Sequence, residues 1–260
     1  MTIRAVLFDL DDTLVPELPA WDLAFADACT DCAPGHNLDP LVLRQTVFRV
    51  TRELWYGSPV GDWSREAGIA FFCALVSEFA GEAPEWGYLR GWTPLWRSTA
   101  WRAGLAEAGI RDAMLAEALA SALSTRFAAA HVLFDDVLPA LDELSCHRLA
   151  VVTNGPSDLQ RRKLAVAGLD GRLPDVYISG EVGYGKPDAR IFEHALAKLG
   201  VGPDEAFVVG DRVNADIAGA RAAGVRSAWL NRNGRKNETD IPVDHEIASL
   251  SELAGLIETL

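Results

Sequence analysis

The sequence predicts an α/β protein built on a three-layer, Rossmann-like parallel sheet, with an all-helical domain inserted after the first strand. Short apolar runs alternate with helical segments from about residue 131 onward, a rhythm typical of right-handed βαβ units. Only helical patterns occur between the first strand and residue 130. We therefore expect a discontinuous core, residues 1–16 and 131–260, and a helical cap domain, residues 17–130.

The first strand is the apolar run Ala5–Phe8, which stops directly at Asp9. A continuous apolar run indicates a strand buried on both faces, as in a parallel sheet. Ligands of such sheets bind beyond the carboxyl ends of the strands, so the Asp9 side chain is expected to face the ligand crevice. Val15–Pro19, with two prolines, is expected to link this strand to the cap, and this linker and Phe127–Asp135 are the expected hinges.

Turns that contain glycine or proline divide the cap into expected helices at Trp21–Ala33, Pro40–Tyr56, Trp63–Phe79, Pro94–Glu107 and Arg111–Ala129. Seven of the eight Trp residues lie between residues 21 and 101. A small helical core needs bulky side chains to bury enough area. We therefore expect most of these rings in the core of the cap, and one or two of them at a pocket.

The rest of the chain continues the core. Strands are expected at Leu149–Thr153, Asp175–Ile178, Ala206–Val209 and Arg226–Leu230, and helices at Val137–Cys146, Ser157–Ala167, Ala189–Leu199, Ala215–Ala223 and Ser249–Leu260. Gly168, Gly200 and Gly224 follow three of these helices, as is typical of helix C-termini. The first strand must join this sheet, because residues 1–16 offer it no partner of their own.

Four polar loops are expected to meet at one edge of this parallel sheet. They carry Asp9 with Asp11, Thr153-Asn154-Gly155, Lys186 within Gly183–Asp188, and Asp211 with Asp216. Each loop by itself is typical of an ordinary turn or helix cap. Four of them at the ends of core strands, in this order, indicate a site.

The chemistry of these loops favours a magnesium site beside an anion cradle. Four converging carboxylates, those of Asp9, Asp11, Asp211 and Asp216, repel one another and need a cation. Oxygen ligands without nearby Cys or His favour Mg²⁺ over Zn²⁺. Thr153 and the backbone N–H groups of Asn154 and Gly155, just before a helix, suit an anion, and Lys186 adds positive charge. Phosphoryl transfer requires a metal ion, a set of anion-binding N–H groups, a cation and one carboxylate that does not bind the metal.

Composition narrows the partners and the location. The net charge of −13 disfavours a nucleic-acid partner, because nucleic-acid binders need a basic face. Neither a secretory signal nor a run of membrane-spanning length is found, so no membrane partner is expected. The four cysteines, with one Cys29-x-x-Cys32 pair and only His36 nearby, favour reduced thiols in a cytoplasmic protein over disulfides or zinc.

As a set, the loop motifs resemble those of the haloacid dehalogenase (HAD) superfamily, whose large phosphatase branch uses an aspartate nucleophile. The resemblance rests on Asp9-Leu-Asp11-Asp12-Thr13, Val151-Val-Thr153-Asn154-Gly155, Gly185-Lys186-Pro187-Asp188 and Val209-Gly210-Asp211 continuing to Asp216. It covers the whole core, and the helical insertion resembles the helical cap of that family. It implies an Mg²⁺-dependent phosphatase with an inserted cap.

The resemblance implies a role for each motif residue. Asp9 is implied as the nucleophile and Asp11 as the general acid and base. Thr153, Asn154, Gly155 and Lys186 are implied to bind the phosphoryl group. Asp9, the backbone carbonyl of Asp11, Asp211 and Asp216 are implied to hold Mg²⁺, whereas Asp12 and Thr13 are implied to cap the turn.

Several alternatives stay open within and beyond this resemblance. A phosphomutase of sugar phosphates uses the same pair of aspartates and differs mainly in the cap. A haloacid dehalogenase lacks an acidic residue two positions after its nucleophile, so Asp11 argues against it. A phosphonate-cleaving relative needs a cap lysine, and no Lys precedes Lys163. A non-catalytic binding module normally loses motif residues that are intact here.

The cap is expected to select the substrate, a small phosphorylated metabolite whose identity the sequence leaves open. Arg49 and Arg52 lie three apart on an expected helix, with Trp55 and Tyr56 just beyond, so they share a face. One hypothesis is that they meet a second anionic group or a sugar face. The competing interpretation, solvated arginines and a core Trp, fits the usual exposure of long charged side chains better. The sequence decides neither between a monomer and a homodimer nor between phosphatase substrates.

Overall fold

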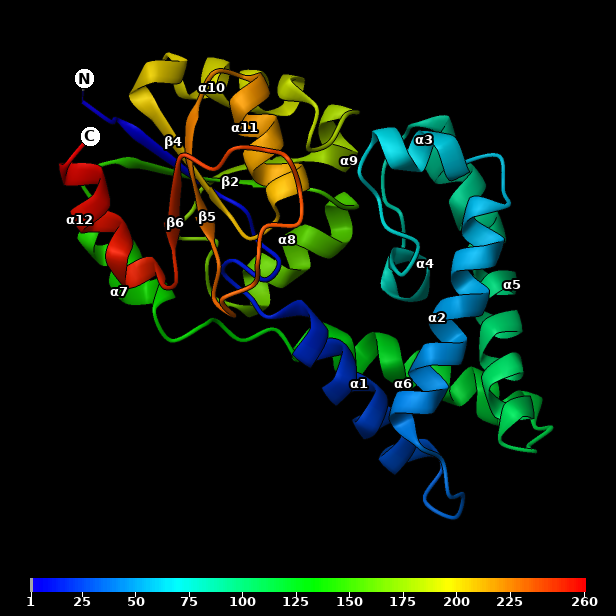
Figure 1. The fold of residues 1–260 in the computed structure, drawn as a ribbon. Helices are drawn as coiled ribbons and strands as arrows, with labels where there is room; N and C mark the ends of the chain where they lie inside the picture. The colour runs from blue at the N-terminus through cyan, green and yellow to red at the C-terminus, as the bar shows by residue number, and fades with distance from the viewer. Residues whose placement is uncertain (1) are drawn as a thin grey trace.

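The computed structural model describes residues 2–260 and shows six parallel strands in one sheet, in the order β3-β2-β1-β4-β5-β6 (Figure 1). The strands are β1 (Ala5–Phe8), β2 (Arg148–Thr153), β3 (Asp175–Ile178), β4 (Ala206–Gly210), β5 (Arg226–Leu230) and β6 (His245–Ile247). β1 lies at the centre, between β2 and β4. The predicted α/β fold with a parallel sheet is confirmed.

Helices cover both faces of the sheet and form the outer layers. On one face, α7 (Val137–Glu143), α8 (Ser157–Val166) and α12 (Leu253–Glu258) pack against Val6 and Phe8 of β1. On the other face, α10 (Ala189–Leu199) and α11 (Ala218–Ala222) pack against Ala5 and Leu7. Because alternate side chains of β1 point to opposite faces, this central strand is apolar throughout.

The inserted segment forms a separate group of helices beside the core (Figure 1). These are α1 (Glu17–Cys32), α2 (Pro40–Tyr56), α3 (Gly61–Glu66), α4 (Cys73–Val76), α5 (Pro84–Glu107) and α6 (Ala113–Ala129). They bury an apolar cluster of their own, in which Trp21 stacks on Phe127 and Phe25 stacks on Trp101. The domain bounds at residues 16/17 and 130/131 stay a prediction. Among residues 2–260, no helix is both long and apolar enough to cross a bilayer.

Two cap predictions are wrong. The expected helix Trp63–Phe79 is broken into α3 and α4 at Gly68, whose φ of +65° ends α3. The expected helix from Pro94 begins ten residues earlier, at Pro84, and continues through Pro94. A proline at the first helical position fits Pro84 equally well, since the missing N–H is unpaired there in any helix.

The link between β1 and the cap is shorter than expected, because α1 begins at Glu17, inside the predicted linker Val15–Pro19. The N–H of Glu17, the first residue of α1, donates to Asp12 Oδ1 over 2.8 Å, so the turn after β1 is tied to the start of this helix. The turn at Asp12 and Thr13 therefore leads into the first helix of the cap without the full linker that the sequence predicted.

In the core, the helix expected at Ala215–Ala223 begins instead with a π-helical turn over Val213–Ile217, followed by α11. The helix expected at Ser249–Leu260 is divided into a short 3-10 turn and α12. The short strand β6 and the one-turn helix α9 (Ser179–Val182) were not predicted. Both are too short to give a clear periodic pattern.

Candidate active site

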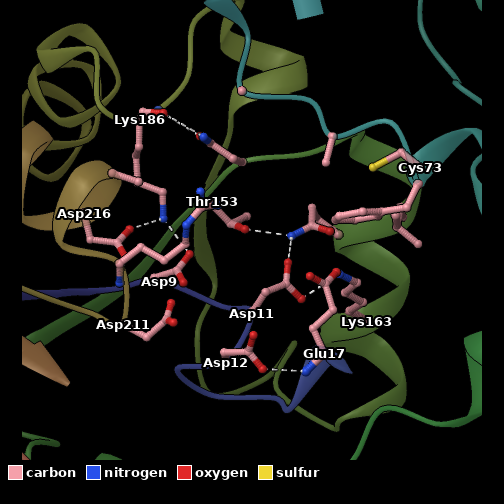
Figure 2. Close-up of a pocket in the computed structure, with 18 of the residues that line it drawn as sticks. Asp9, Asp11, Asp12, Glu17, Cys73, Thr153, Lys163, Lys186, Asp211 and Asp216 are labelled. Atoms are coloured by element: carbon pink, nitrogen blue, oxygen red, sulfur yellow. Dashed lines mark hydrogen bonds and ion pairs between the residues drawn. The ribbon is translucent and has the colours of Figure 1, made fainter. Parts of the chain in front are cut away.

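The register of the sheet brings the predicted residues together. Phe8 of β1 pairs with Val151 of β2 on one side and with Val209 of β4 on the other. The last residues of these strands and the residues that follow them therefore emerge side by side at one edge. Asp9, Thr153 and Asp211 lie there, and Figure 2 shows them around one pocket.

The pocket at this edge has a volume of about 440 Å³, within the range of small-molecule sites. Its lining includes seven of the eight predicted site residues: Asp9, Asp11, Thr153, Asn154, Lys186, Asp211 and Asp216. Gly155 is the exception. Its N–H donates to Ser179 Oγ over 3.0 Å, so this amide is already paired in the structure, and its binding of a phosphoryl group stays a prediction.

Lys186 sits at the centre of the carboxylate cluster. Its Nζ lies 2.5 Å from Asp9 Oδ1 and 2.7 Å from Asp216 Oδ1, and it also donates to the Val152 carbonyl. Burial by itself lowers the pKa of Lys186, but the carboxylates of Asp216 and Asp9 outweigh it and raise that pKa above its usual value. Lys186 is therefore a fixed cation.

One lysine does not neutralise this cluster. Burial raises the pKa of Asp9 well above its usual value, and the carboxylates of Asp216, Asp211 and Asp11 add to that effect while Lys186 opposes it. Burial, followed by Asp216 and Asp12, raises the pKa of Asp211 to about 7. The cluster thus holds more carboxylates than the neighbouring cations neutralise.

The same carboxylates fit a divalent metal ion. Oxygens of Asp9, Asp211 and Asp216 all lie within 4.8 Å of one another, and the three residues are buried. Asp211 Oδ1 is buried and has no hydrogen-bond partner among the described residues. Glycine is needed at position 210 for Asp216 to lie in this cluster, because a Cβ on residue 210 would overlap the Asp216 carboxylate. A hard cation with oxygen ligands would satisfy these groups.

Asn154 and Gln160 hold the phosphoryl-binding candidates in place. The Asn154 side chain accepts from the Lys186 N–H over 2.8 Å and donates to the Lys186 carbonyl over 2.9 Å. Gln160 Nε2 donates to Thr153 Oγ1 over 2.7 Å. Asn154 therefore positions Lys186 through its side chain, whereas the sequence predicted a contribution from its backbone N–H.

A second buried lysine, which the sequence analysis missed, lies beside Asp11. Lys163 Nζ lies 2.6 Å from Asp11 Oδ1 and 2.9 Å from Glu17 Oε1, and the Lys163 side chain is only 1% exposed. Gln160 donates to the other oxygen of Asp11 over 2.9 Å. Both oxygens of Asp11 are thus held by α8, while Glu17 joins the group from the start of the cap (Figure 2).

A sequence signal for this group exists. Gln160 and Lys163 are three apart on the helix that follows Thr153-Asn154-Gly155, so they share one face of that helix. This helix begins directly after the loop that is predicted to form part of the site. Polar residues on that face are candidates for the site.

The cap completes the pocket with mostly apolar side chains. Tyr56 comes from α2, and Ala70, Phe71, Phe72 and Cys73 come from the segment between α3 and α4 and the start of α4. No Trp among the described residues lines the pocket, so the expectation of one or two pocket Trp rings is wrong. Trp55 is buried and donates to Ser64 Oγ.

The arginines proposed for substrate recognition lie away from this pocket. Arg49 is about half exposed and pairs with Glu107 over 2.8 Å and with Glu53 over 3.5 Å. Arg52 is exposed, and neither arginine belongs to the lining. The competing interpretation of solvated arginines agrees with the structure, whereas Tyr56 of the same segment does line the pocket.

Cap and core touch directly above the site. The Gly185 N–H donates to the Glu66 carbonyl of α3 over 3.2 Å, and Ser77 Oγ donates to Asp158 of α8 over 2.9 Å. Gly68 lies so close to Asn154 that a Cβ would overlap its side-chain amide. The backbone of the cap therefore approaches the Asn154 side chain of the core closely at Gly68, where only a glycine fits.

Gly68→Ala is expected to lower kcat at least tenfold, because its methyl group keeps the cap from reaching Asn154. The variant also holds Ala at φ +65°, which costs about 1–2 kcal/mol. Gly109→Ala is the matched control, since Gly109 also has a positive φ but nothing lies within 4 Å of its Cβ position. Both variants should lose similar stability in urea titrations, and only Gly68→Ala should lose activity. Equal activities of the two variants would contradict this role.

The chain matches a known protein family over most of its length. A family model described as haloacid dehalogenase-like hydrolase matches residues 3–224. The chain is 34% identical over 256 residues to a phosphoserine phosphatase of Thermus thermophilus, covering 96% of this chain and 98% of that protein. It is 30% identical over 265 residues to a glyceraldehyde 3-phosphate phosphatase of Methanopyrus kandleri, covering 99% and 98%.

A solved structure has the same fold. The putative HAD-hydrolase YfnB from Bacillus subtilis, bound to magnesium, superposes with a TM-score of 0.69 over 99% of both chains. The two sequences are 22% identical in this comparison, so the likeness concerns the fold.

Proposed function

The chain belongs to the haloacid dehalogenase-like hydrolase family and is a phosphatase like its curated relatives, and we propose that it hydrolyses a small phosphate monoester through an aspartyl-phosphate on Asp9. The observation that carries this proposal is the convergence of Asp9, Asp11, Thr153, Lys186 and Asp211 on one pocket. Its relatives act, by their names, on phosphoserine and glyceraldehyde 3-phosphate, which supports a small phosphorylated metabolite as substrate.

In the first step, a carboxylate oxygen of Asp9 attacks phosphorus, and the bond from phosphorus to the substrate's alcohol oxygen breaks. Lys186, 2.5 Å from Asp9 Oδ1, balances negative charge on the transferring group, and Thr153 Oγ1 lies at the same edge. Asp11 in its acid form gives its proton to the leaving alkoxide.

In the second step, the Asp11 carboxylate takes a proton from a water molecule, whose oxygen attacks phosphorus. The Asp9–phosphorus bond breaks, phosphate leaves, and Asp9 returns as a carboxylate. Asp11 lies where the core meets the cap, with Lys163 and Gln160 on its two oxygens. This location, on the side of the pocket where the cap residues lie, supports the assignment of Asp11 to the leaving group.

Asp9, Asp211 and Asp216, together with the Asp11 backbone carbonyl, are the proposed ligands of Mg²⁺. The orphaned Asp211 Oδ1 and the three clustered carboxylates support this assignment. When bound, the ion neutralises the carboxylates and the phosphoryl oxygens, so that anionic groups approach each other.

The proposal is tested with a panel of phosphate monoesters, with Mg²⁺ and with EDTA. We expect phosphate release with Mg²⁺ and a loss of at least 100-fold in EDTA that added Mg²⁺ restores. EDTA-resistant release would contradict the metal assignment. No release from any ester, combined with interconversion of sugar phosphates, would support a phosphomutase instead.

A further inference from the structure

The leaving-group end of the pocket differs chemically from the phosphoryl end. Figure 2 shows Asp9, Asp211, Asp216 and Lys186 on one side of the pocket and Cys73 of the cap on the other. On the cap side the lining consists of Tyr56, Ala70, Phe71, Phe72 and Cys73, together with Gly68 and Glu17. Aromatic and small apolar side chains therefore surround the space that a substrate's organic part would fill.

The two lysines of the pocket are already engaged by carboxylates. Lys186 pairs with Asp9 and Asp216, and Lys163 pairs with Asp11 and Glu17. Arg235 pairs with Asp211 over 3.3 Å at the phosphoryl end. Arg212, the residue after Asp211, is exposed and forms no ion pair among the described residues.

The cap adds no cation to this lining. Among residues 2–260, the one charged side chain that the cap contributes is Glu17, an acid. Arg65 stacks on the Tyr56 ring at 4.5 Å and pairs with Asp62, but it lies outside the lining. The cap side of the leaving-group end is thus mostly apolar, and the charged groups beside it, Lys163, Asp11 and Glu17, are paired with one another.

We propose that this enzyme selects monoesters whose organic part is uncharged and presents a flat or apolar face to Tyr56, Phe71 and Phe72. A second carboxylate or phosphate on the substrate would be desolvated at this end beside Glu17, where Lys163 is already paired with Asp11 and Glu17, which is unfavourable. A flat ring or sugar face gains contact area and edge or face packing against the aromatic rings. The volume of about 440 Å³ holds a phosphoryl group with a ring of this kind.

This inference rests on the proposed phosphatase activity, and pairs of esters that differ in one charge test it. The pairs are glycerol 1-phosphate with 3-phosphoglycerate, and phenyl phosphate with 4-carboxyphenyl phosphate. We expect kcat/KM to be at least tenfold higher for the neutral member of each pair, and O-phosphoserine to be a poor substrate. Equal or higher values for the carboxylated members would overturn the inference while leaving the phosphatase proposal intact. Absence of release from every ester would overturn the phosphatase proposal itself.

A charge placed in the cap tests the same idea from the protein side. Phe71→Arg puts a cation at the leaving-group end, and we expect it to raise kcat/KM for 3-phosphoglycerate relative to glycerol 1-phosphate at least tenfold. Trp92→Arg is the matched control, because Trp92 is a cap aromatic, 45% exposed and outside the lining. An unchanged ratio in a folded Phe71→Arg, or an equal shift in Trp92→Arg, would overturn the inference. The ester pairs on the unaltered protein give an answer even where Phe71→Arg does not fold.

Discussion

Asp9→Asn is expected to reduce phosphate release by at least 10⁴-fold, because the amide cannot attack phosphorus. The substitution keeps the shape of the side chain, and in EDTA we expect the variant to melt at or above the wild-type temperature. Asp9, Asp211 and Asp216 crowd oxygens within 4.8 Å, with Lys186 as their close cation, so removal of one negative charge relieves repulsion. Functional sites of this kind often lower stability.

Mg²⁺ provides the second measurement for this variant. The wild-type melting temperature should rise with added Mg²⁺, since a ligand that binds only the folded state stabilises it, and Asp9→Asn should show a smaller rise. Asp170→Asn is the control, because Asp170 is exposed and lies outside the pocket lining. Wild-type phosphate release by Asp9→Asn would contradict the role of Asp9 as the nucleophile.

Lys163→Met is expected to give the second largest effect, a destabilised protein with at least tenfold lower kcat. Breaking a buried ion pair costs about 3–5 kcal/mol, and the lower end applies because Asp11 and Glu17 are 20% and 17% exposed. Without Lys163, Asp11 keeps only the Gln160 contact and loses its fixed position. Alkyl esters should suffer more than nitrophenyl phosphate, because a poor leaving group depends on the proton that Asp11 donates.

The pH dependence of that instability identifies its cause. Burial, with Asp11 and Asp12 adding to it and Lys163 opposing it, raises the pKa of Glu17 from 4.5 to about 7. A folded state that binds more protons than the unfolded chain loses stability as pH rises between these values. Removal of Lys163 raises the pKa of Glu17 further, so the stability deficit of Lys163→Met should be larger at pH 8 than at pH 5.5.

Two further variants complete the Lys163 test. Adding Glu17→Gln to Lys163→Met should restore part of the stability at pH 8 without restoring kcat, since Asp11 still lacks its lysine. Lys198→Met, which changes an exposed lysine on α10, should alter the unfolding free energy by less than about 0.5 kcal/mol. Full activity in Lys163→Met would show that the ion pair only stabilises the fold.

Much of the core could be predicted because parallel strands leave a strong signal. A buried strand such as Ala5–Phe8 is apolar throughout, and its end marks where polar site residues begin. Once the strands are known to be parallel, their ends must meet at one edge, so the convergence of Asp9, Thr153, Lys186 and Asp211 follows from topology.

The cap and the shell around Asp11 could not be predicted in the same way, because tertiary contacts decide them. Gly68 interrupts an apolar run that looks helical, and its close approach to Asn154 joins parts of the chain that are far apart in sequence. Lys163 resembles a solvated helix residue until Asp11 and Glu17 are seen to enclose it. The spacing of Gln160 and Lys163 marks a shared helix face, but it does not identify Asp11 and Glu17 as the partners on that face.

The aspartyl-phosphate on Asp9 is the central claim, and a burst experiment with para-nitrophenyl phosphate tests it most directly. Nitrophenolate leaves without help from an acid, so Asp11→Asn should still transfer the phosphoryl group to Asp9 but hydrolyse it slowly. We predict a rapid burst of one nitrophenolate per active site in Asp11→Asn, with phosphate on the peptide that carries Asp9. The Asp9→Asn/Asp11→Asn double variant should show neither. A burst that persists in the double variant, or phosphate on another residue, would contradict the mechanism.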